Sequence, residues 1–208
     1  MSAPDYTLYL VTDDPKAYSS SIFDGVEAAI HGGATMVQYR ASGGSGRYQY
    51  ETALRLKERL SQLGIPLIVN DRLDLALAVD ADGLHVGQND LPVQVARRLL
   101  GKQRILGLSI TDPRQLESVD YSIVDYLGAG PVFATATKTD AAPAMGLDTL
   151  SKITRQSKVP VVAIGGINLS NAKSVFDAGV HGLAVVSALS RSQDPQTTAR
   201  RFRLATSS

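Results

Sequence analysis

The chain alternates, eight times over, between a short apolar stretch and a longer segment whose apolar residues recur at helical spacing. The apolar stretches are rich in strand-forming residues, and most of them end in glycine or in polar residues. They predict strands at residues 6–11, 36–37, 67–69, 83–86, 104–108, 123–127, 159–164 and 183–186. The segments between them predict helices at residues 22–30, 48–63, 73–79, 91–100, 147–156, 168–177 and 193–204, and one more that begins at Thr111-Asp112-Pro113.

Eight strand–helix units in one chain predict an α/β fold, a compact (β/α)8 TIM barrel. Three helix-to-strand joints, at residues 31–34, 81–83 and 178–182, also look alike, which is typical of repeated units. An open, doubly wound sheet with fewer true strands is the alternative. A chain of 208 residues is long enough for one sizeable core and short for two ordinary domains. We therefore predict a single barrel domain over residues 1–208, with the active site at the C-terminal ends of the strands.

The composition narrows the classes of partner. The formal net charge is +1 without a long basic run, which gives no support to nucleic-acid binding. The absence of cysteine excludes disulfides and thiolate metal sites and fits a reducing compartment. The N-terminus has no secretory signal pattern, and no apolar run approaches the roughly 20 residues of a membrane helix. We expect a cytoplasmic protein that acts on small molecules, with no nucleic-acid or membrane partner, and a homo-oligomer is left open.

Polar residues or glycines stand where most of the predicted strands end. In a barrel these ends meet at one face, so they predict one pocket built from residues scattered along the sequence. The candidates are Gln38, Arg40, Asn70, Asp71, Asp90, Ser109, Thr135, Thr137, Lys138, Gly165, Gly166, Val186 and Ser187.

Asp71 and Asp90 predict a magnesium site. Mg²⁺ prefers oxygen ligands and keeps waters and substrate phosphates, so one or two carboxylates are enough. The alternative is that each aspartate only caps the following helix, because Asp71 precedes Leu73 and Asp90 precedes Leu91.

Arg40 and Lys138 predict the cations that hold a diphosphate. Arginine can grip two phosphate oxygens at once, and lysine supplies a compact charge. Lys138 follows Thr135 and Thr137 in a loop whose small residues would let phosphate oxygens approach the backbone. The alternative for each cation is an ordinary solvated side chain.

A second anion site is predicted where the strands at 159–164 and 183–186 end. Backbone N–H groups of Gly165-Gly166 and Val186-Ser187, with a helix N-terminus behind them, suit a phosphate at a place where such barrels often bind one. Two anion sites and a magnesium site imply two phosphorylated substrates, or one substrate with phosphates at both ends.

The histidines predict no general base. His31 and His181 fall in helix-to-strand joints, away from the expected site, and His85 lies inside a strand, where a hydrogen-bonded core histidine is the ordinary interpretation. No Ser-His-Asp set or HExxH helix is present. The chemistry should need little proton transfer, as when a diphosphate leaves.

Seven motifs, in order along nearly the whole chain, carry a specific resemblance. They lie at residues 8–13, 37–40, 69–72, 84–90, 130–138, 163–167 and 185–187. With them the sequence strongly resembles the thiamine-phosphate synthase family, also called thiamine-phosphate pyrophosphorylases. The resemblance implies a (β/α)8 fold, Mg²⁺ as cofactor, and the joining of a hydroxymethylpyrimidine diphosphate to a hydroxyethylthiazole phosphate with release of diphosphate.

The resemblance also implies a role for each candidate residue. Asp71 and Asp90 would bind magnesium, and Arg40, Lys138 and Ser109 would carry the catalytic roles. Arg40 and Lys138, with Asn70, would hold the diphosphate, and Gln38 and Ser109 would face the aminopyrimidine. The thiazole phosphate would lie near the side chains of Thr135 and Thr137 and the backbone of Gly165, Gly166, Val186 and Ser187.

The implied mechanism is dissociative. Diphosphate leaves first, the aminopyrimidine stabilises a cation, and the thiazole nitrogen attacks that cation. Magnesium and cationic side chains stabilise the charge that builds on the leaving group, which agrees with the lack of a general base.

One position departs from the family pattern. The family usually has Gln-x-Arg-x-Lys after the second strand, whereas this chain has Gln38-Tyr39-Arg40-Ala41-Ser42. Loss of that charged contact is expected to cost roughly 1.5–3 kcal/mol of diphosphate binding unless another cation, such as Arg47, replaces it.

Two other functions remain as alternatives. A related thiazole tautomerase would have a histidine just after the fifth strand, where this chain has Ser109-Ile110-Thr111. A catalytically inactive barrel that binds a thiamine precursor would fit the missing lysine, but it does not account for Asp71, Asp90 and Lys138.

Overall fold

The chain folds into a closed ring of eight parallel strands, which the computed structural model describes over residues 3–135 and 143–206. Each strand pairs with the next in sequence order, and β8 pairs with β1 to complete the ring. The strands are β1 (Leu8–Val11), β2 (Met36–Tyr39), β3 (Leu67–Asn70), β4 (Gly83–Val86), β5 (Ile105–Ile110), β6 (Tyr126–Ala129), β7 (Val161–Ile164) and β8 (Gly182–Val185). This closure confirms the predicted (β/α)8 barrel, and the open sheet is wrong.

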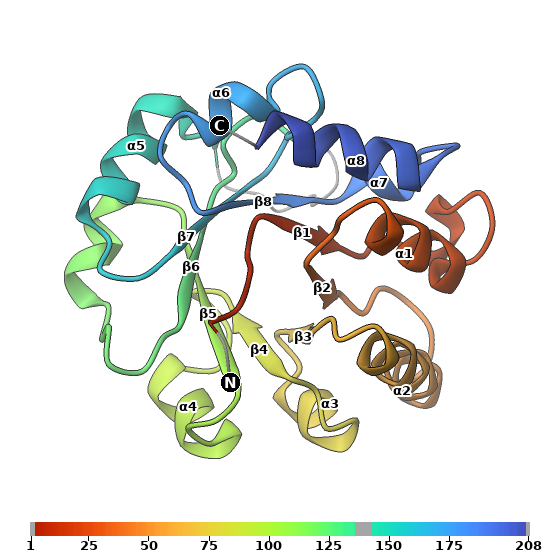
Figure 1. Cartoon of the computed structure of the whole chain (residues 1–208). Helices are drawn as coiled ribbons and strands as arrows, with labels where there is room; N and C mark the ends of the chain where they lie inside the picture. Colours follow the sequence, from red (N-terminus) through yellow and green to blue (C-terminus); the bar gives the residue numbers. More distant parts are fainter. Residues whose placement is uncertain (1–2, 136–142, 207–208) are drawn as a thin grey trace.

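Helices surround the ring (Figure 1). They are α1 (Ile22–His31), α2 (Gly46–Gln62), α3 (Leu73–Ala78), α4 (Val93–Leu100), α5 (Gly146–Gln156), α6 (Ala172–Phe176), α7 (Ser187–Ser190) and α8 (Pro195–Ala205), with 3₁₀-helices η1 (Pro15–Ala17) and η2 (Pro113–Ser118). The short α7 was not predicted. The helix expected from Thr111-Asp112-Pro113 is only η2, because Leu116 is its one buried residue and no apolar stripe supports a longer α-helix.

Alternate residues of each strand belong to two different layers. On β1, Leu8 and Leu10 pack with the surrounding helices in the large core, while Tyr9 packs in a smaller cluster inside the ring. The inner cluster consists of Tyr6, Tyr9, Val11, Met36, Ile68, Tyr126, Val162 and Ala184. The interior is therefore packed with side chains, and its tyrosines bring hydroxyl groups into it.

The N-terminal segment covers the end of the ring at which the strands begin. It runs across that end before entering β1 (Figure 1), and the Tyr6 ring packs against Tyr126 with ring centroids 5.0 Å apart. The opposite end, where the strands finish, carries the candidate residues described below.

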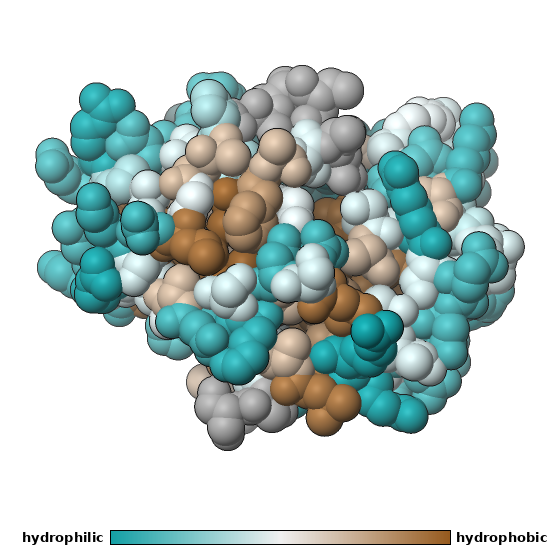
Figure 2. Space-filling view, turned by 90° about the horizontal axis from the view of Figure 1, so that it is seen from above, coloured by the Kyte–Doolittle hydropathy of each residue, from teal (hydrophilic) through white to brown (hydrophobic). Residues whose placement is uncertain are grey.

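The outer surface is mixed in character. On the side shown in Figure 2, hydrophobic areas are interrupted by hydrophilic residues. Among the residues that the structure describes, no helix combines the length and apolar character needed to cross a membrane.

Candidate functional site

The ends of β2, β3 and β4 bring together much of the predicted polar set. Gln38 is the third residue of β2, and Arg40 directly follows that strand. Asn70 is the last residue of β3, Asp71 follows it, and the Asp71 N–H donates to the His85 carbonyl on β4 at 2.8 Å. Because β2, β3 and β4 are consecutive in the ring, these groups share one part of the rim.

Ser109 lies within β5 rather than after it. The sequence placed the end of this strand at Leu108, but pairing continues to Ile110, where Ser109 pairs with Gly128 and Ile110 with Ala129 of β6. Hydrogen bonds to β6 therefore extend the strand past a polar residue. The Ser109 side chain is half-buried, near the end of the barrel at which the strands finish.

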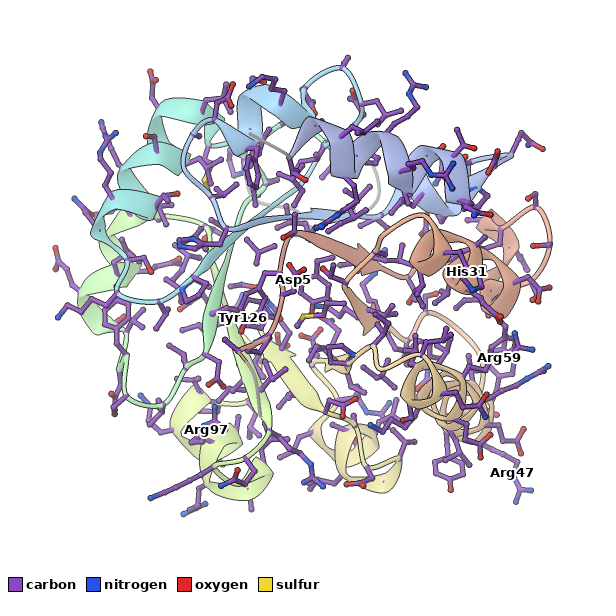
Figure 3. All side chains as sticks on the ribbon, viewed as in Figure 1. Asp5, His31, Arg47, Arg59, Arg97 and Tyr126 are labelled. Carbon is purple, nitrogen blue, oxygen red and sulfur yellow. The ribbon has the colours of Figure 1, made fainter. Side chains whose placement is uncertain are left out.

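A continuous chain of hydrogen bonds crosses the interior of the barrel. The Gln38 amide nitrogen donates to the Tyr9 hydroxyl at 3.0 Å, and the Tyr9 and Tyr126 hydroxyls lie 2.9 Å apart. The Tyr126 hydroxyl lies 2.8 Å from His85 Nδ1, and His85 Nε2 lies 2.9 Å from Ser109 Oγ. We call these five residues the interior chain; Tyr126, near its centre, is labelled in Figure 3.

Two glycines make room for the interior chain. A Cβ atom on Gly107 would lie 2.2 Å from Tyr126 Cζ and 2.4 Å from His85 Nδ1. A Cβ atom on Gly128 would lie 2.9 Å from His85 Cε1. Glycine inside a strand costs stability, and it often marks a place where another group approaches closely. Here the approaching groups are the histidine and the central tyrosine.

Burial keeps the two phenols of the interior chain protonated. Removal from water raises the pKa of both Tyr9 and Tyr126 well above the usual value for tyrosine. Each hydroxyl therefore keeps its proton across the ordinary pH range, so each can donate one hydrogen bond while accepting another. His85, expected to be a hydrogen-bonded core histidine, is buried with partners at both ring nitrogens.

Arg40 is held from two sides. Its backbone N–H donates to Thr12 Oγ1 at 3.0 Å, and its guanidinium lies 3.6 Å from a carboxylate oxygen of Asp13. Asp13 is itself buried, accepts a hydrogen bond from the Ser190 hydroxyl at 3.1 Å, and lies 3.8 Å from the guanidinium of Arg191. The loops after β1 and β8 thus fix a cation at the end of β2.

Neither candidate metal ligand caps the helix that follows it. The N-cap of α3 is Arg72 and that of α4 is Pro92, and neither helix has a side-chain cap. Asp71 has the left-handed φ of 60° and accepts from the Asn70 amide at 2.5 Å, while Asp90 accepts from the Gly87 N–H at 2.7 Å. The capping alternative is therefore wrong, and the magnesium role stays a prediction.

The donor set limits what metal could bind. In the described part of the chain, histidines and carboxylates form no group of three or more that could hold a metal ion. Two carboxylates beside an anion site nevertheless suit Mg²⁺, which takes its remaining oxygens from water and from substrate phosphates.

The loops after β6 and β7 approach each other closely. Gly165 and Gly166 have left-handed φ values of 99° and 66°, and a Cβ atom on them would meet Pro131 at 2.5 Å and Phe133 at 2.7 Å. The Phe133 N–H donates to the Gly165 carbonyl at 3.1 Å. Thr135 is half-buried, while Thr137 and Lys138 lie outside the described residues.

The end of β8 leads directly into a short helix. Val186 is the N-cap of α7 and Ser187 is its first residue. Ser187 also borders an open hollow of about 420 Å³, lined by Asn168, Leu169, Ser170, Ser187, Ala188, Arg191, Ser192 and Thr198. The predicted role of these backbone groups in binding phosphate stays a prediction.

Tyr9, Asp13 and Tyr126 belong to the site but were not predicted to do so. Tyr9 and Asp13 stood within a motif of the resemblance, and Tyr126 stood in a predicted strand. A tyrosine at an inward strand position is a usable signal, because a buried hydroxyl requires a hydrogen-bond partner. Its actual partner depends on the register between strands, which the sequence does not display.

The comparisons with known proteins agree with this geometry. A family model described as thiamine monophosphate synthase matches residues 8–189. This chain belongs to that family. A thiamine-phosphate synthase of Syntrophomonas wolfei is 49% identical over 199 residues, covering 96% of this chain and 95% of that protein. One of Chloroflexus aurantiacus is 50% identical, covering 96% and 92%.

A solved structure shares both the fold and the family. The thiamine phosphate pyrophosphorylase from Pyrococcus furiosus has a TM-score of 0.87 and 35% sequence identity to this chain. The match covers 98% of this chain and 96% of that structure. The thiamine monophosphate synthase family thus accounts for the whole barrel rather than for one part of it.

Proposed function

We propose that this member of the thiamine monophosphate synthase family joins two phosphorylated heterocycles. The first is 4-amino-2-methyl-5-hydroxymethylpyrimidine diphosphate and the second is 4-methyl-5-(2-hydroxyethyl)thiazole phosphate. The products are thiamine phosphate and diphosphate, so the protein is a transferase with small-molecule substrates. The family match over almost the whole chain, with relatives at 49% and 50% identity, supports the assignment.

One observation supports the reaction most directly. A fixed arginine, an amide and two carboxylates lie at the ends of three consecutive strands, beside the interior chain that ends in Gln38 and Ser109. Such a rim can bind the charged diphosphate outside while the polar interior receives the uncharged ring. A substrate with one strongly anionic end and one hydrogen-bonding ring fits this division.

Magnesium is part of the proposal. Asp71 and Asp90 would hold Mg²⁺, with Asn70 beside Asp71. The bound ion would neutralise charge on the diphosphate as it leaves.

The chain's own residues would stabilise and orient the leaving group. Arg40, held by Asp13 and Thr12, would bind diphosphate oxygens in a fixed direction, and Lys138 would add a second cation. Fixed charges aimed at a leaving group lower the barrier because they need no rearrangement during the reaction.

The second substrate would complete the reaction. Gln38 and Ser109 would hold the aminopyrimidine while the diphosphate departs, leaving a ring-stabilised cation. Thr135, Thr137 and the backbone of Gly165, Gly166, Val186 and Ser187 would hold the thiazole phosphate so that its ring nitrogen attacks that cation. No group has to remove a proton from the nucleophile.

The two alternatives have no support from the comparisons. The named relatives are thiamine-phosphate synthases and a thiamine phosphate pyrophosphorylase, and none is a tautomerase or an inactive barrel. A tautomerase-like relative would also need a histidine just after the fifth strand, and this chain has Ser109-Ile110-Thr111 there. The proposal also includes a cytoplasmic location and no nucleic-acid partner, and it leaves open a homo-oligomer. Each of these needs its own test.

The proposal is tested by mixing purified protein with both substrates and Mg²⁺ and measuring both products. We expect thiamine phosphate and diphosphate in equal amounts, with activity lost on chelation and reduced at least about 100-fold by Asp90→Ala. Asp177→Ala is the matched control, because Asp177 is exposed at the C-terminal end of α6 and its ion pair in the described part of the chain is with the exposed Lys173. Diphosphate release without thiamine phosphate, or no product at all, would contradict the proposal.

A further inference from the structure

The interior chain takes one side chain from each of five strands and crosses the barrel. It runs from Gln38 on β2 through Tyr9 on β1 and Tyr126 on β6 to His85 on β4 and Ser109 on β5. Its two ends are therefore separated by strands β3 and β4 along the ring. Residues so separated usually act independently in binding, unless something physical connects them.

One arrangement of the hydrogen atoms gives every link of the chain a donor and an acceptor. The Gln38 amide nitrogen donates to the Tyr9 hydroxyl at 3.0 Å. Tyr9 has a single hydroxyl hydrogen, which it can donate to Tyr126, and Tyr126 can in turn donate to His85 Nδ1. A neutral histidine that accepts at Nδ1 carries its proton on Nε2, so it donates to Ser109 Oγ.

This arrangement determines what the two ends present. With its nitrogen turned inward, Gln38 directs its carbonyl oxygen, an acceptor, away from Tyr9. Ser109, which accepts from His85, keeps its own hydroxyl hydrogen to donate elsewhere. To exchange these roles, the Gln38 amide would have to flip, both phenols would have to rotate, and the histidine would have to change tautomer.

The barrel is shaped to keep the links of this chain in place. Gly107 and Gly128 leave space that any Cβ atom would fill, and the space is taken by Tyr126 and His85. Burial keeps both phenols protonated, so the two links that they supply do not change over the ordinary pH range.

We infer that Tyr9, Tyr126 and His85 are positioning residues that couple Gln38 to Ser109, so that the two ends act as one acceptor–donor pair for an aminopyrimidine. An exocyclic amino group donates to an acceptor and a ring nitrogen accepts from a donor, which is the pair that this arrangement of the chain provides. The inference rests on the proposed function, since it concerns the ring of the first substrate.

The test is a double-mutant cycle measured in four backgrounds: the unchanged protein, Tyr126→Phe, Tyr9→Phe and Tyr6→Phe. Gln38→Leu and Ser109→Ala, singly and together, are assayed by kcat/KM for the pyrimidine diphosphate at saturating thiazole phosphate. In the otherwise unchanged protein we expect the double variant to deviate from the product of the single effects by about fivefold or more. In the Tyr126→Phe background, which removes only the central hydroxyl, the deviation should fall to within about twofold.

Tyr6→Phe supplies the matched control. Its ring packs on Tyr126, but its hydroxyl is not part of the interior chain. In this background the fivefold deviation should persist, because the same atom is removed next to the chain rather than from it. Tyr9→Phe is a second variant that removes a hydroxyl from the interior chain, and it should also reduce the deviation to within about twofold. It keeps the inference testable if Tyr126→Phe does not fold.

The outcomes separate this inference from the proposed function. If the unchanged protein forms no thiamine phosphate, the proposed function is wrong. If it forms thiamine phosphate while Gln38→Leu and Ser109→Ala combine additively, the coupling is wrong and the proposed function stands. Coupling that survives in both the Tyr126→Phe and the Tyr9→Phe backgrounds would overturn the positioning role of the interior chain.

Discussion

The interior of the barrel and its rim contain polar groups of opposite character. Inside, the side chains of the interior chain hydrogen-bond to one another in series, and Tyr9 and Tyr126 are almost completely buried. At the rim, Asp71 and Asp90 are exposed; Asp71 accepts a hydrogen bond from the Asn70 amide, and Asp90 accepts one from the Gly87 N–H. The middle residues of the interior chain bond to one another, whereas the rim carries charged groups at the surface.

This difference indicates a division of work within one site. A buried hydrogen-bond series fixes geometry, because a lost partner leaves a costly unsatisfied group. An exposed carboxylate contributes little to stability and can exchange water for a metal ion or a substrate. Changes inside should therefore affect both folding and activity, whereas changes at the rim should affect activity alone.

The largest expected effect is on stability and comes from Gly107→Ala. The new methyl group would lie 2.2 Å from Tyr126 Cζ, so the ring or the backbone would have to move. We expect the free energy of unfolding to fall by about 3 kcal/mol, as in strongly overpacked cores. Urea denaturation measures this, with Gly46→Ala as the control, because a Cβ there meets nothing within 4 Å. Equal stability of the two variants would contradict the tight fit described for the interior.

A smaller effect is expected from Asp13→Asn, which removes the carboxylate that pairs with Arg40 at the rim. The neutral amide would no longer hold the Arg40 guanidinium, now 3.6 Å away. We expect kcat/KM for the pyrimidine diphosphate to fall about tenfold, since one charge-assisted contact is typically worth about 1.5 kcal/mol or more.

Asp14→Asn is the control for that change. Asp14 is exposed and caps η1 through Lys16, a role that asparagine fills equally well. An unchanged kcat/KM in Asp13→Asn, or the same fall in both variants, would show that Asp13 does not position Arg40.

The smallest effect is expected from Ser42→Lys, which restores the family's lysine at the rim. Ser42 Oγ is buried and has no hydrogen-bond partner in the described structure, so no existing bond is lost. We expect the KM for the pyrimidine diphosphate to fall about threefold, less than a full charged contact, because the surrounding loop is not shaped for the new side chain. Ser42→Met, similar in length but uncharged, should leave KM unchanged, and an equal effect of both variants would exclude a role for charge.

Much of the fold could be predicted from the sequence because its signals are local. Most strands are buried apolar stretches of about the predicted extent, and strand order follows from the repeated unit. The exception is β6, which spans Tyr126–Ala129 instead of the predicted residues 123–127. The same logic places Arg40, Asn70 and Asp71 at one rim, since they follow neighbouring strands. Their ligands cannot be seen in the sequence or in the fold, so the roles assigned through the family remain predictions.

The interior chain could not be predicted, because it depends on register between strands that are distant in sequence. Tyr9 meets Tyr126 across 117 positions, and Ser109 meets His85 only because β5 continues past its apolar core. The capping alternative for Asp71 and Asp90 failed for a different reason, which is that other residues occupy the N-cap positions. Helices α3 and α4 begin at Leu73 and Val93, with Arg72 and Pro92 as the N-caps.

The most direct test of a charged, metal-binding rim is thermal unfolding with diphosphate and Mg²⁺, added separately and together. We predict that the melting temperature rises clearly only when both are present, because the ion and the anion complete one site. Asp90→Ala should abolish this rise without lowering the melting temperature of the ligand-free protein. An equal rise with diphosphate alone, or no rise with both, would contradict a magnesium site at the ends of these strands.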